Sequence, residues 1–357
     1  MWQVESANAD DNAAICALQS DKAMKGRISL ALERRPSFFD ALSVEGVRNS
    51  VFVAKNERHE VIGMCCRSVR PVWVDGEVCA LGYLGSLRVH GCLKGRIKPL
   101  AAGFRACRDD HQAQELPYDI TSILSDNREA RRLLERNLSH LPKYRAVAPF
   151  KTFVMTTGKS RCKGAKLQPE ELPRFISFIN QTNRRFDFAP AWQESDFGSH
   201  LLKGVDAESC TMIEDGGVPV ATGAVWDQRA FKQTTVTGYA PLVARFRGFI
   251  NLGLTVAGKP TLPSAGRQLN LGYVSLLAVQ DENEDVFMEM ISRLKAIARR
   301  KGLQYLVLGL DARRALAQVA AKRLHARTIE SHIYTVAYEP SANPPASGLV
   351  HLEVATL

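Results

Sequence analysis

The most regular hydrophobic pattern in the first half of the chain runs from Leu81 to Val89 and predicts a buried β-strand. A short segment with two glycines and two cations follows it. Apolar positions then recur at the spacing of a helix, at Ile97, Leu100, Ala101 and Phe104. Pro99 fits this helix, because proline is well tolerated in a first helical turn. The backbone N–H groups and the dipole of a helix that starts after such a loop favour binding of phosphate.

Shorter patterns place further strands around this unit. Residues 50–54 and 61–66 predict a hairpin, and a second hairpin is expected to turn at Asp75-Gly76 and to return into the Leu81 strand. The apolar run 118–124 predicts another buried strand. We expect it to be parallel to the Leu81 strand, because a helix crosses between the two.

The second half of the chain repeats this order of elements. Residues 210–213 and 218–221 predict a hairpin, and residues 271–279 align with residues 81–89 without a gap, with identity at five of the nine positions. Similar order together with similar sequence indicates an internal duplication.

Two domains follow from the duplication. We expect the first over residues 1–157 and the second over residues 167–357, joined by the basic segment 158–166, which is rich in small residues. Each domain is predicted to be mixed α/β, with a mainly antiparallel sheet flanked by helices. In the second domain, Asp311 is expected to cap the last helix.

Residues 89–99 resemble the strand end and pyrophosphate loop of the GNAT superfamily of acyl-CoA-dependent acyltransferases, which runs roughly V-x-P-x-x-R-G-x-G-[IL]-[GA]. The valine is kept, Lys94 stands in the arginine position, and Gly95 follows it. Gly91 replaces the proline and Ile97 replaces the second glycine. The predicted order of elements also resembles that of the GNAT superfamily. Helices come first, and antiparallel strands follow and end at a glycine-containing loop.

The resemblance implies which residues would hold the coenzyme of an acyl-CoA. They are Leu87, Arg88 and Val89 for the pantetheine arm, Lys94, Gly95, Arg96 and Ile97 for the pyrophosphate, and Asn127 and Arg131, which would line the coenzyme from the next helix. The main chain of the first three would pair with pantetheine like an added strand. An ordinary strand–loop–helix junction with solvated cations, and plain helix capping at Asn127, are the alternatives.

The helix that starts near residue 126 resembles the family's N-x-x-A-x-x-[LF]-Y segment, with Asn127, Ala130 and Leu133 in register. Asp126 is expected to cap its first turn. Leu134 stands where the family often has a tyrosine that protonates the departing thiolate. The usual proton donor is therefore missing.

The corresponding loop of the second half runs from Gln280 to Asp285 and contains four acids and no glycine. Acidic side chains would repel a pyrophosphate. We therefore expect the second half to lack a coenzyme site and to support the first half.

The net charge of +10 and a pI near 9.3 favour an anionic partner such as coenzyme A, nucleic acid or an acidic surface. The cations are dispersed along the chain, so a nucleic-acid partner is not expected. The eight cysteines show no zinc-binding spacing, and no metal is expected. The sequence has no apolar run of membrane-spanning length and no signal-peptide pattern, so we expect a cytoplasmic protein.

Acyl transfer to an amine requires a base that keeps the amine neutral. His90, at the end of the Leu81 strand, is the candidate base, because the pKa of histidine lies near neutrality. Asp119 and Glu77 are alternatives. Cys92 could in principle act as a nucleophilic thiol, although no orienting third group is evident. Tyr144 could replace the missing proton donor, but a place in the core explains it better.

The sequence thus predicts an acyl-CoA-dependent N-acyltransferase, most simply one that transfers acetyl from acetyl-CoA to an amine of unknown identity. Two alternatives remain at this stage. One is a Fem-like transferase that takes its donor from aminoacyl-tRNA, and the other is a scaffold or ligand sensor without catalysis. The role of the insertion 241–263 stays open between a packed element, a lid, and a surface for lipid or a partner.

Overall fold

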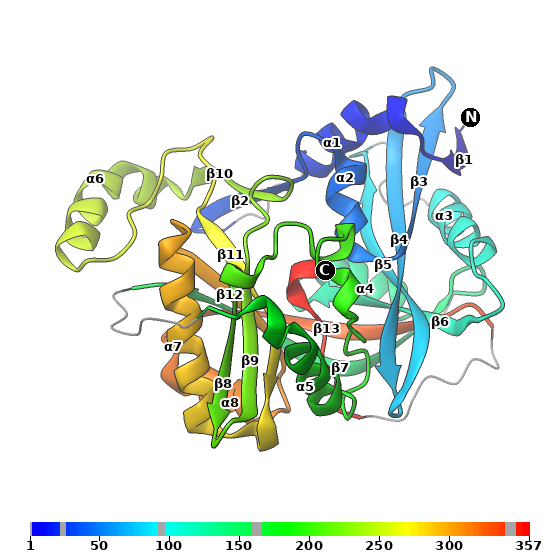
Figure 1. The fold of residues 1–357 in the computed structure, drawn as a ribbon. Helices are drawn as coiled ribbons and strands as arrows, with labels where there is room; N and C mark the ends of the chain where they lie inside the picture. The colour runs from blue at the N-terminus through cyan, green and yellow to red at the C-terminus, as the bar shows by residue number, and fades with distance from the viewer. Residues whose placement is uncertain (1, 22–25, 92–96, 137, 159–165, 340–347) are drawn as a thin grey trace.

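The computed structural model describes residues 2–21, 26–91, 97–136, 138–158, 166–339 and 348–357. Figure 1 shows two groups of strands and helices, with the C-terminal residues between them. The first half contains β1 (Trp2–Ser6), α1 (Asn12–Ser20), β2 (Ile28–Glu33), α2 (Phe38–Leu42), the short 3₁₀ helix η2 (Ser43–Glu45), β3 (Arg48–Asn56), β4 (Val61–Val74), β5 (Glu77–Val89), α3 (Ile97–Asp109), β6 (Glu115–Leu124), α4 (Arg128–Leu134) and β7 (Lys143–Thr156).

The second half follows the same order from its first hairpin on, with β10 and α6 inserted, but it has no counterpart of β1, β2 and α2. Its elements are α5 (Leu172–Asn183), β8 (Cys210–Asp215), β9 (Val218–Trp226), β10 (Gln233–Tyr239), α6 (Pro241–Val256), β11 (Leu271–Val279), the 3₁₀ helix η8 (Gln280–Glu282), α7 (Glu284–Arg300), β12 (Tyr305–Asp311), α8 (Ala315–Arg323), β13 (Arg327–Ala337) and the 3₁₀ helix η9 (Val354–Thr356). The predicted mixed α/β class, with a mainly antiparallel sheet and flanking helices, is confirmed.

In the described part of the chain, eleven strands form one sheet in the order β1-β3-β4-β5-β6-β13-β7-β12-β11-β9-β8. The last strand of each half lies beside a strand of the other half. β13 pairs with β6 over Ala337–Ser331, and β7 pairs with β12 over Phe150–Thr156. β13 and β7 also pair with each other. The two halves therefore share a continuous sheet through an exchange of their final strands.

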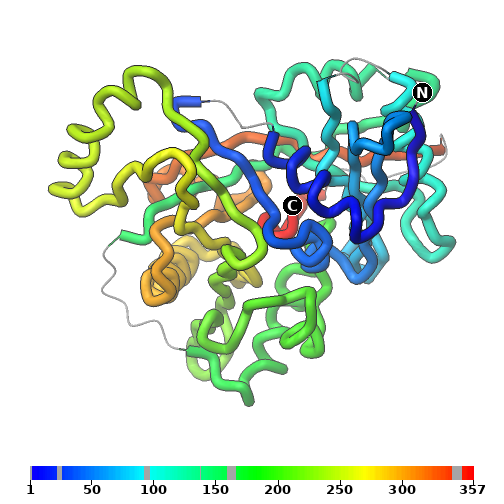
Figure 2. Tube along the Cα trace, turned by 90° about the horizontal axis from the view of Figure 1, so that it is seen from above, coloured from blue at the N-terminus to red at the C-terminus, as the bar shows by residue number. Residues whose placement is uncertain are grey.

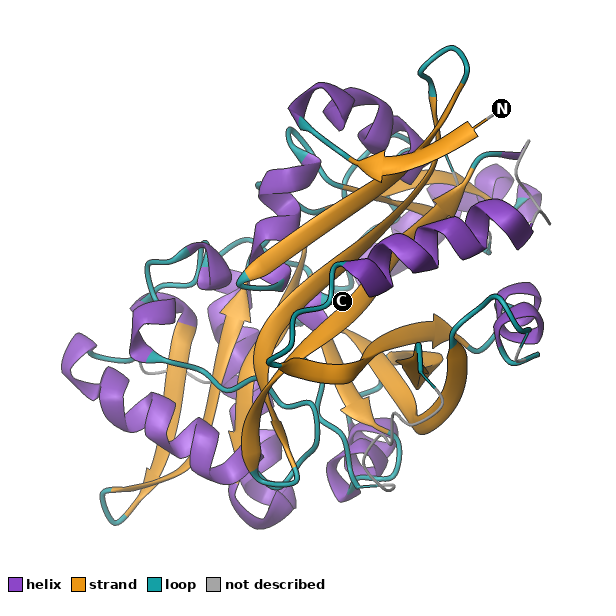
Figure 3. Cartoon of the chain, turned by 90° about the vertical axis from the view of Figure 1, so that its right-hand side faces the viewer, coloured by secondary structure: helices purple, strands orange, loops and turns teal. Residues whose placement is uncertain are grey.

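Side-chain alternation along the strands explains why helices cover both faces of the first half. Val51 and Val53 of β3 belong to a core that includes Phe38 of α2. Phe52, between them, points to the opposite face and packs in a second core with Phe104 of α3. Figure 3 shows helices on both sides of the strands.

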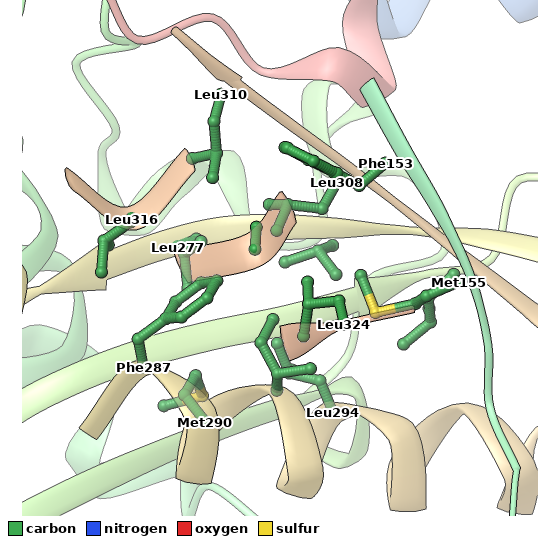
Figure 4. Packing of buried hydrophobic residues seen from close by; sticks show 14 of the residues in the cluster. Phe153, Met155, Leu277, Phe287, Met290, Leu294, Leu308, Leu310, Leu316 and Leu324 are labelled. Carbon is green, nitrogen blue, oxygen red and sulfur yellow. The ribbon is translucent and has the colours of Figure 1, made fainter. Parts of the chain in front are cut away.

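The second half is built in the same way. Ala224 and Trp226 of β9 pack in a core with Phe175 of α5, whereas Val225 packs in the opposite core with Leu294 of α7. Figure 4 shows this latter core and labels Phe153, Met155, Leu277, Phe287, Met290, Leu294, Leu308, Leu310, Leu316 and Leu324. Phe153 and Met155 come from β7, so the exchanged strand completes the core of the second half.

A second, two-stranded sheet joins the halves on another side. β10 pairs antiparallel with β2, from Gln233 beside Glu33 to Tyr239 beside Ile28. The sequence pattern did not indicate β2. We refer to this pair as the β2–β10 ribbon, and Figure 2 shows it passing near the C-terminus and leading outward toward α6.

Two cap predictions were wrong. The α4 helix is capped by Asn127, whose Oδ1 accepts a hydrogen bond from the Ala130 N–H at 3.2 Å, and not by Asp126. Asp311 does not cap α8, because it is the last residue of β12 and its carboxylate accepts from the Arg313 side chain and from the Val350 N–H. In both cases the chain turns at a different residue from the one that the pattern favoured.

Candidate active site

β5 separates from β6 partway along its length. The two strands pair in parallel only from Ala80 to Tyr83, and β5 then continues beside β4 to Val89. Ser86 lies at the bend with a φ of 52°, and the β4–β5 register shifts at this point, as in a β-bulge. We call this divergence of β5 and β6 the first fork.

The same geometry recurs in the second half. β11 pairs with β12 only from Leu271 to Tyr273, and its register with β9 shifts between Ser275 and Ala278. Leu276 has a φ of 53° inside this shift. We call the divergence of β11 and β12 the second fork.

The second fork is filled by the segment 350–357. The Glu353 carboxylate accepts a hydrogen bond from the Leu276 N–H at 3.1 Å, so it satisfies the main chain of the bulge. Val354 lies against β12 so closely that a Cβ at Gly309 would approach the Val354 Cβ to 2.8 Å. The Asn183 side-chain amide donates to the Leu277 carbonyl at 3.1 Å. An extended ligand therefore has no place at the second fork.

The first fork has a different environment. Among the described residues, the main-chain partners of β5 beyond Tyr83 are β4 and side-chain donors, such as the Thr121 hydroxyl, which donates to the Leu84 carbonyl at 2.7 Å. Leu87 is 40% exposed, and Arg88 and Val89 are half-buried. The three residues predicted to pair with pantetheine are thus accessible at the outer end of this fork.

The predicted pyrophosphate loop is only partly described. Lys94, Gly95 and Arg96, together with Cys92, lie outside the described residues. Ile97 begins α3 and is 41% exposed. The strand and helix that flank the loop are at the predicted positions.

A small apolar cavity of about 40 Å³ lies beside β5, next to α3. It is lined by Val4, Phe52, Cys65, Leu87, Val89, Leu100 and Phe104, among others. Leu87 and Val89 therefore contribute to an apolar surface on the α3 side of the first fork.

The three residues that the sequence offers as candidate general bases, His90, Glu77 and Asp119, lie in different environments. His90 is exposed directly after β5, and its main-chain N–H donates to the Ile62 carbonyl at 2.8 Å. Glu77 is exposed at the opposite end of β5. Asp119 is fully buried and is held by the Arg67 guanidinium, so it is not accessible to a substrate amine.

A cluster of buried ion pairs lies at the inner end of the first fork, where β5 and β6 are still paired. The Arg67 guanidinium is fully buried and donates to Asp119 at 3.0 Å, to Glu115 at 2.6 Å and to Asp110 at 3.0 Å. A Cβ at Gly82, which pairs with Asp119 across β5 and β6, would lie 2.0 Å from the Asp119 Oδ1. Only glycine therefore allows the ion pair and the strand pairing at this point.

The α4 residues predicted to line the coenzyme have protein partners. Asn127 is the helix cap, and the Arg131 Nε donates to the Tyr334 hydroxyl at 3.0 Å. Leu134 and Tyr144 are buried in the core under α3, where the Tyr144 ring contacts Phe104 edge-on with centroids 6.0 Å apart. Tyr144 is thus a core aromatic, as the sequence favoured.

A cluster of buried charges, not anticipated as a unit from the sequence, lies where the two halves meet. The Glu45 carboxylate of η2 contacts the Arg34 guanidinium at 2.5 Å and the Lys232 ammonium at 3.0 Å. Lys232 also donates to the Ala355 carbonyl at 3.2 Å. The Arg34 guanidinium stacks over Phe38, and its Nη1 is buried without a hydrogen-bond partner in the described part of the chain. We call Arg34, Glu45 and Lys232 the central charge cluster.

Arg70 extends this arrangement toward the segment 350–357. Its guanidinium is buried, donates to the Thr356 hydroxyl at 3.1 Å and to the Val44 carbonyl at 3.3 Å, and lies over the Trp192 ring.

Burial raises the pKa of Glu353 to about 7. Burial also lowers the pKa of Lys232 to about 8, although Glu45 opposes that shift. Two buried groups thus titrate near neutrality, which is frequent at functional sites.

Two tyrosines mark the inner ends of the forks, within electrostatic range of the central charge cluster. Tyr83 and Tyr273 lie at equivalent positions, at the last paired residues of β5 with β6 and of β11 with β12. Burial raises the pKa of both hydroxyls, and the charge on Arg34 lowers both pKa values in turn. The charge on Glu45 further raises the pKa of Tyr83. The central charge cluster is therefore electrostatically coupled to the inner end of each fork.

Arg88 lies on the same face of the sheet. It stands opposite Met64 on β4, and Met64 packs in the core that contains Phe38. Residues directly opposite in an antiparallel pair project to the same side. Burial lowers the pKa of Arg88, and the nearby Arg34 charge lowers it further. Local sequence patterns do not relate Lys232 to this cluster, because its partner Glu45 belongs to the other half of the chain.

The described residues contain no cluster of three or more His, Cys, Asp or Glu side chains that could hold a metal ion. In the same parts of the chain, no helix has both the length and the apolar character needed to cross a membrane.

No family model matches the sequence, and no curated protein matches it. Solved structures do match the fold. Saccharomyces cerevisiae N-myristoyltransferase with bound myristoyl-CoA superposes with a TM-score of 0.62 and 10% identity, over 98% of this chain and 85% of that chain. A GCN5-related N-acetyltransferase from Sphaerobacter thermophilus gives a TM-score of 0.53 and 10% identity, over 100% of this chain and 98% of that chain.

A third match is the GCN5-related glucosamine N-acetyltransferase region of a fungal multi-domain β-N-acetylglucosaminidase, with a TM-score of 0.58 and 12% identity. It covers 94% of this chain and 38% of that chain. Identities this low establish the fold alone. The chain has the fold of the GNAT-superfamily N-acyltransferases, with two GNAT-like halves that share one sheet.

Proposed function

We propose that this protein is an N-acyltransferase that uses an acyl-CoA donor and binds it at the first fork. The observation that carries the proposal is the difference between the forks, because segment 350–357 fills the second and no comparable segment of the described chain enters the first. The two amides of pantetheine can add to an exposed strand edge as a peptide does. Leu87, Arg88 and Val89 offer that edge, and Lys94, Gly95, Arg96 and Ile97 would hold the pyrophosphate.

The simplest donor is acetyl-CoA. Acetyltransferases are among the proteins with this fold, and so is a myristoyltransferase with bound myristoyl-CoA. A series of acyl-CoA donors of increasing chain length tests this choice directly.

For the chemistry we assign proton removal to Lys232. Its pKa of about 8 leaves part of the population neutral near pH 7, so its Nζ can accept a proton from the acceptor amine. The amine nitrogen then attacks the thioester carbonyl, the C–S bond breaks, and coenzyme A leaves as the thiolate with the bonding electron pair. Glu45 holds Lys232 in place at 3.0 Å. The partnerless Nη1 of Arg34 is a donor for the developing oxyanion.

His90 remains the alternative base proposed from the sequence. It is exposed at the outer end of β5, whereas the Lys232 side chain lies in the central charge cluster and keeps 11% of its surface exposed, unlike the fully buried Asp119. A general base is most effective when its pKa lies near the working pH, and burial brings the pKa of Lys232 to about 8. We therefore rank Lys232 above His90, and variants at both positions separate the two assignments.

The first experiment is calorimetric titration of acetyl-CoA into the wild type and into Gly95→Asp. The added carboxylate should repel the pyrophosphate from the loop, so binding should weaken strongly. Gly248→Asp is the matched control, because it adds the same charge on α6, where a side chain at this position meets nothing within 4 Å. Equal loss of binding in both variants would point to a general charge effect and not to the loop.

Turnover is then followed through release of the coenzyme A thiol in the presence of a panel of amines. Binding that disappears in Gly95→Asp, together with amine-dependent thiol release, supports the proposal. Binding without release for any amine would favour a non-catalytic acyl-CoA sensor. If the wild type binds no acyl-CoA, the assignment is wrong.

A further inference from the structure

The insertion between β10 and β11 forms a helical arm. α6 spans Pro241–Val256, and none of its residues is buried. Figures 1 and 2 show it projecting from the body at the outer end of the β2–β10 ribbon. The sequence left the role of this segment open between packing, a lid and a surface element. The structure excludes packing against the main sheet for α6 itself.

The orientation of this helix is the reverse of an ordinary surface helix. Its inner side is polar: Asn251 donates to the Leu262 carbonyl at 3.0 Å and accepts from the Leu262 N–H at 2.8 Å, and Arg247 donates to the same carbonyl at 3.4 Å. These bonds hold α6 to the returning segment 257–263. A surface helix of a globular protein normally turns its apolar stripe toward the body instead.

The outer side of α6 is apolar and faces solvent. Its exposed side chains are Leu242 (73%), Phe246 (46%), Phe249 (77%), Leu252 (65%) and Val256 (83%). Positions 242, 246, 249 and 256, together with Gly253, are spaced by three or four residues, so they form one stripe along the helix. Single exposed apolar residues need no explanation, but a contiguous stripe on a projecting helix marks an interaction surface.

The charged residues of the arm all have one sign. Residues 241–263 contain no aspartate or glutamate, and their cations are Arg245, Arg247 and Lys259. Arg245, on the outer half of the helix, is exposed beside Phe246. An apolar stripe with adjacent cations and without acids is complementary to a surface that is apolar inside and anionic outside.

We propose that α6 and the segment 257–263 are a membrane-docking arm that inserts its apolar stripe into the interface of an anionic lipid bilayer. Burial of Phe and Leu side chains at the acyl boundary and attraction of Arg and Lys to anionic headgroups are the two contributions that hold interfacial helices. A second copy of the chain fits less well, because a symmetric contact would place two acid-free arms against each other in a protein with a net charge of +10.

The ribbon sets the distance between the arm and the candidate active site. β10 starts next to Lys232 and ends just before α6, and a strand of its seven residues spans about 20 Å. Docking through α6 would thus hold the central charge cluster near the lipid surface without burying it. An acceptor or donor that is itself associated with lipid would be concentrated there, an extension that rests on the proposed function.

The test is co-sedimentation of the full chain with vesicles of phosphatidylcholine alone and of phosphatidylcholine mixed with phosphatidylglycerol. We expect binding to the mixed vesicles and much weaker binding to phosphatidylcholine. Phe249→Glu should lower the partition coefficient about tenfold or more, because it removes an inserted ring and adds an anion. Arg245→Glu should lower it roughly fivefold or more through the loss of one cation near the surface.

Val218→Glu is the matched control, because Val218 is 61% exposed on β9, outside the arm, and the substitution adds the same charge. It should bind mixed vesicles like the wild type. The proposal is overturned if the wild type does not bind the mixed vesicles, or if Phe249→Glu binds them unchanged. It is also overturned if sedimentation velocity without lipid reveals a dimer that Phe249→Glu dissociates, because the stripe would then serve a second copy. Titration with acyl-CoA tests the proposed enzymatic function and does not depend on vesicle binding. The two experiments therefore distinguish a failure of the membrane-docking proposal from a failure of the proposed function.

Discussion

Ser86 and Leu276 occupy the same place in the two halves and have the same left-handed backbone, with φ values of 52° and 53°. They are aligned in the internal repeat, since each follows its aligned leucine, Leu81 or Leu271, by the same number of residues. Both lie in a register shift where the strand begins to leave its parallel neighbour. The duplication thus preserves the fork in both halves, although the two residues have different side chains.

The bulge at Ser86 should resist branched side chains. A β-branched residue strongly disfavours a positive φ, so Ser86→Val should lower the free energy of unfolding by about 1–2 kcal/mol. Ser29→Val on β2 is the control, because valine is favoured in strands and Ser29 is not among the residues with positive φ. Urea denaturation of both variants measures the difference. Equal stability of the two variants would contradict a left-handed Ser86.

Gly82→Ala should be among the most damaging small substitutions in the chain. The new Cβ would meet the Asp119 Oδ1 at 2.0 Å and the Arg67 Nη2 at 2.8 Å, so the buried ion pair must move apart. Disrupting a buried pair costs about 3 kcal/mol or more. By contrast, a Cβ at Gly248 on α6 would meet nothing within 4 Å, and alanine has a higher helix propensity than glycine. Gly248→Ala should therefore increase the stability of the helix slightly. A thermal unfolding series that ranks the two alike would contradict this account of Gly82.

The stability of the protein should depend on the ionisation of Glu353. Burial raises its pKa from 4.5 to about 7, so the native state binds the proton more tightly than the unfolded chain does. The contribution of this group is therefore full below about pH 4.5 and is lost as the pH rises to about 7, a loss of about 3 kcal/mol.

Glu353→Gln keeps an acceptor for the Leu276 N–H and cannot ionise. We expect the variant to be more stable than the wild type near pH 8 and to differ little near pH 4, as measured by denaturant unfolding at both values. Glu170→Gln, the same substitution at an exposed position, is the control and should follow the wild-type curve. If the difference in free energy of unfolding between the wild type and Glu353→Gln is the same at both pH values, the pKa of Glu353 is not raised.

The parts of the fold that were predictable from sequence have local signals. The Asp75-Gly76 hairpin and the strand and helix on either side of the loop 90–96 follow from turn residues and periodicity, and the repeat of residues 81–89 at 271–279 reveals the duplication. The family resemblance then indicated the fold that the solved structures confirm.

The central charge cluster and the filling of the second fork had no such local signal. Lys232 and Glu45 are far apart in the chain, and so are Glu353 and Leu276, so no periodicity relates them. β2 was missed for a related reason, because its partner β10 belongs to the other half. Contacts of this kind depend on how the halves pack, which composition and spacing do not encode.

The strand exchange predicts that the first half does not fold alone. In the intact chain, β7 pairs with β12 and β13, and β6 pairs with β13. These partner strands, β12 and β13, belong to the second half. A fragment of residues 1–157 would expose these edges, which favours aggregation. We expect it to be insoluble by itself and to become soluble on co-expression with residues 167–357. A soluble, monomeric fragment with cooperative thermal unfolding would instead support 1–157 as an independent domain.

Lys232→Met should reduce kcat by about 10²–10⁴ with a smaller effect on binding of acyl-CoA, because it removes the proton acceptor. The wild-type rate should rise with pH through about 8, the pKa to which burial lowers Lys232, since only the neutral amine can take the proton. This inflection should be absent in the variant. His90→Ala, made in parallel, should retain it.

Exposed Lys143→Met on β7 is the control for loss of a lysine and should change neither kcat nor its pH profile. A structural role of Lys232 would lower the melting temperature and binding along with kcat, so both are measured on each variant. If instead His90→Ala abolishes the pH inflection and Lys232→Met keeps it, the base lies at the outer end of β5. The central charge cluster would then serve to hold the two halves together, because Glu45 from the first half and Lys232 from the second would remain a buried ion pair between them.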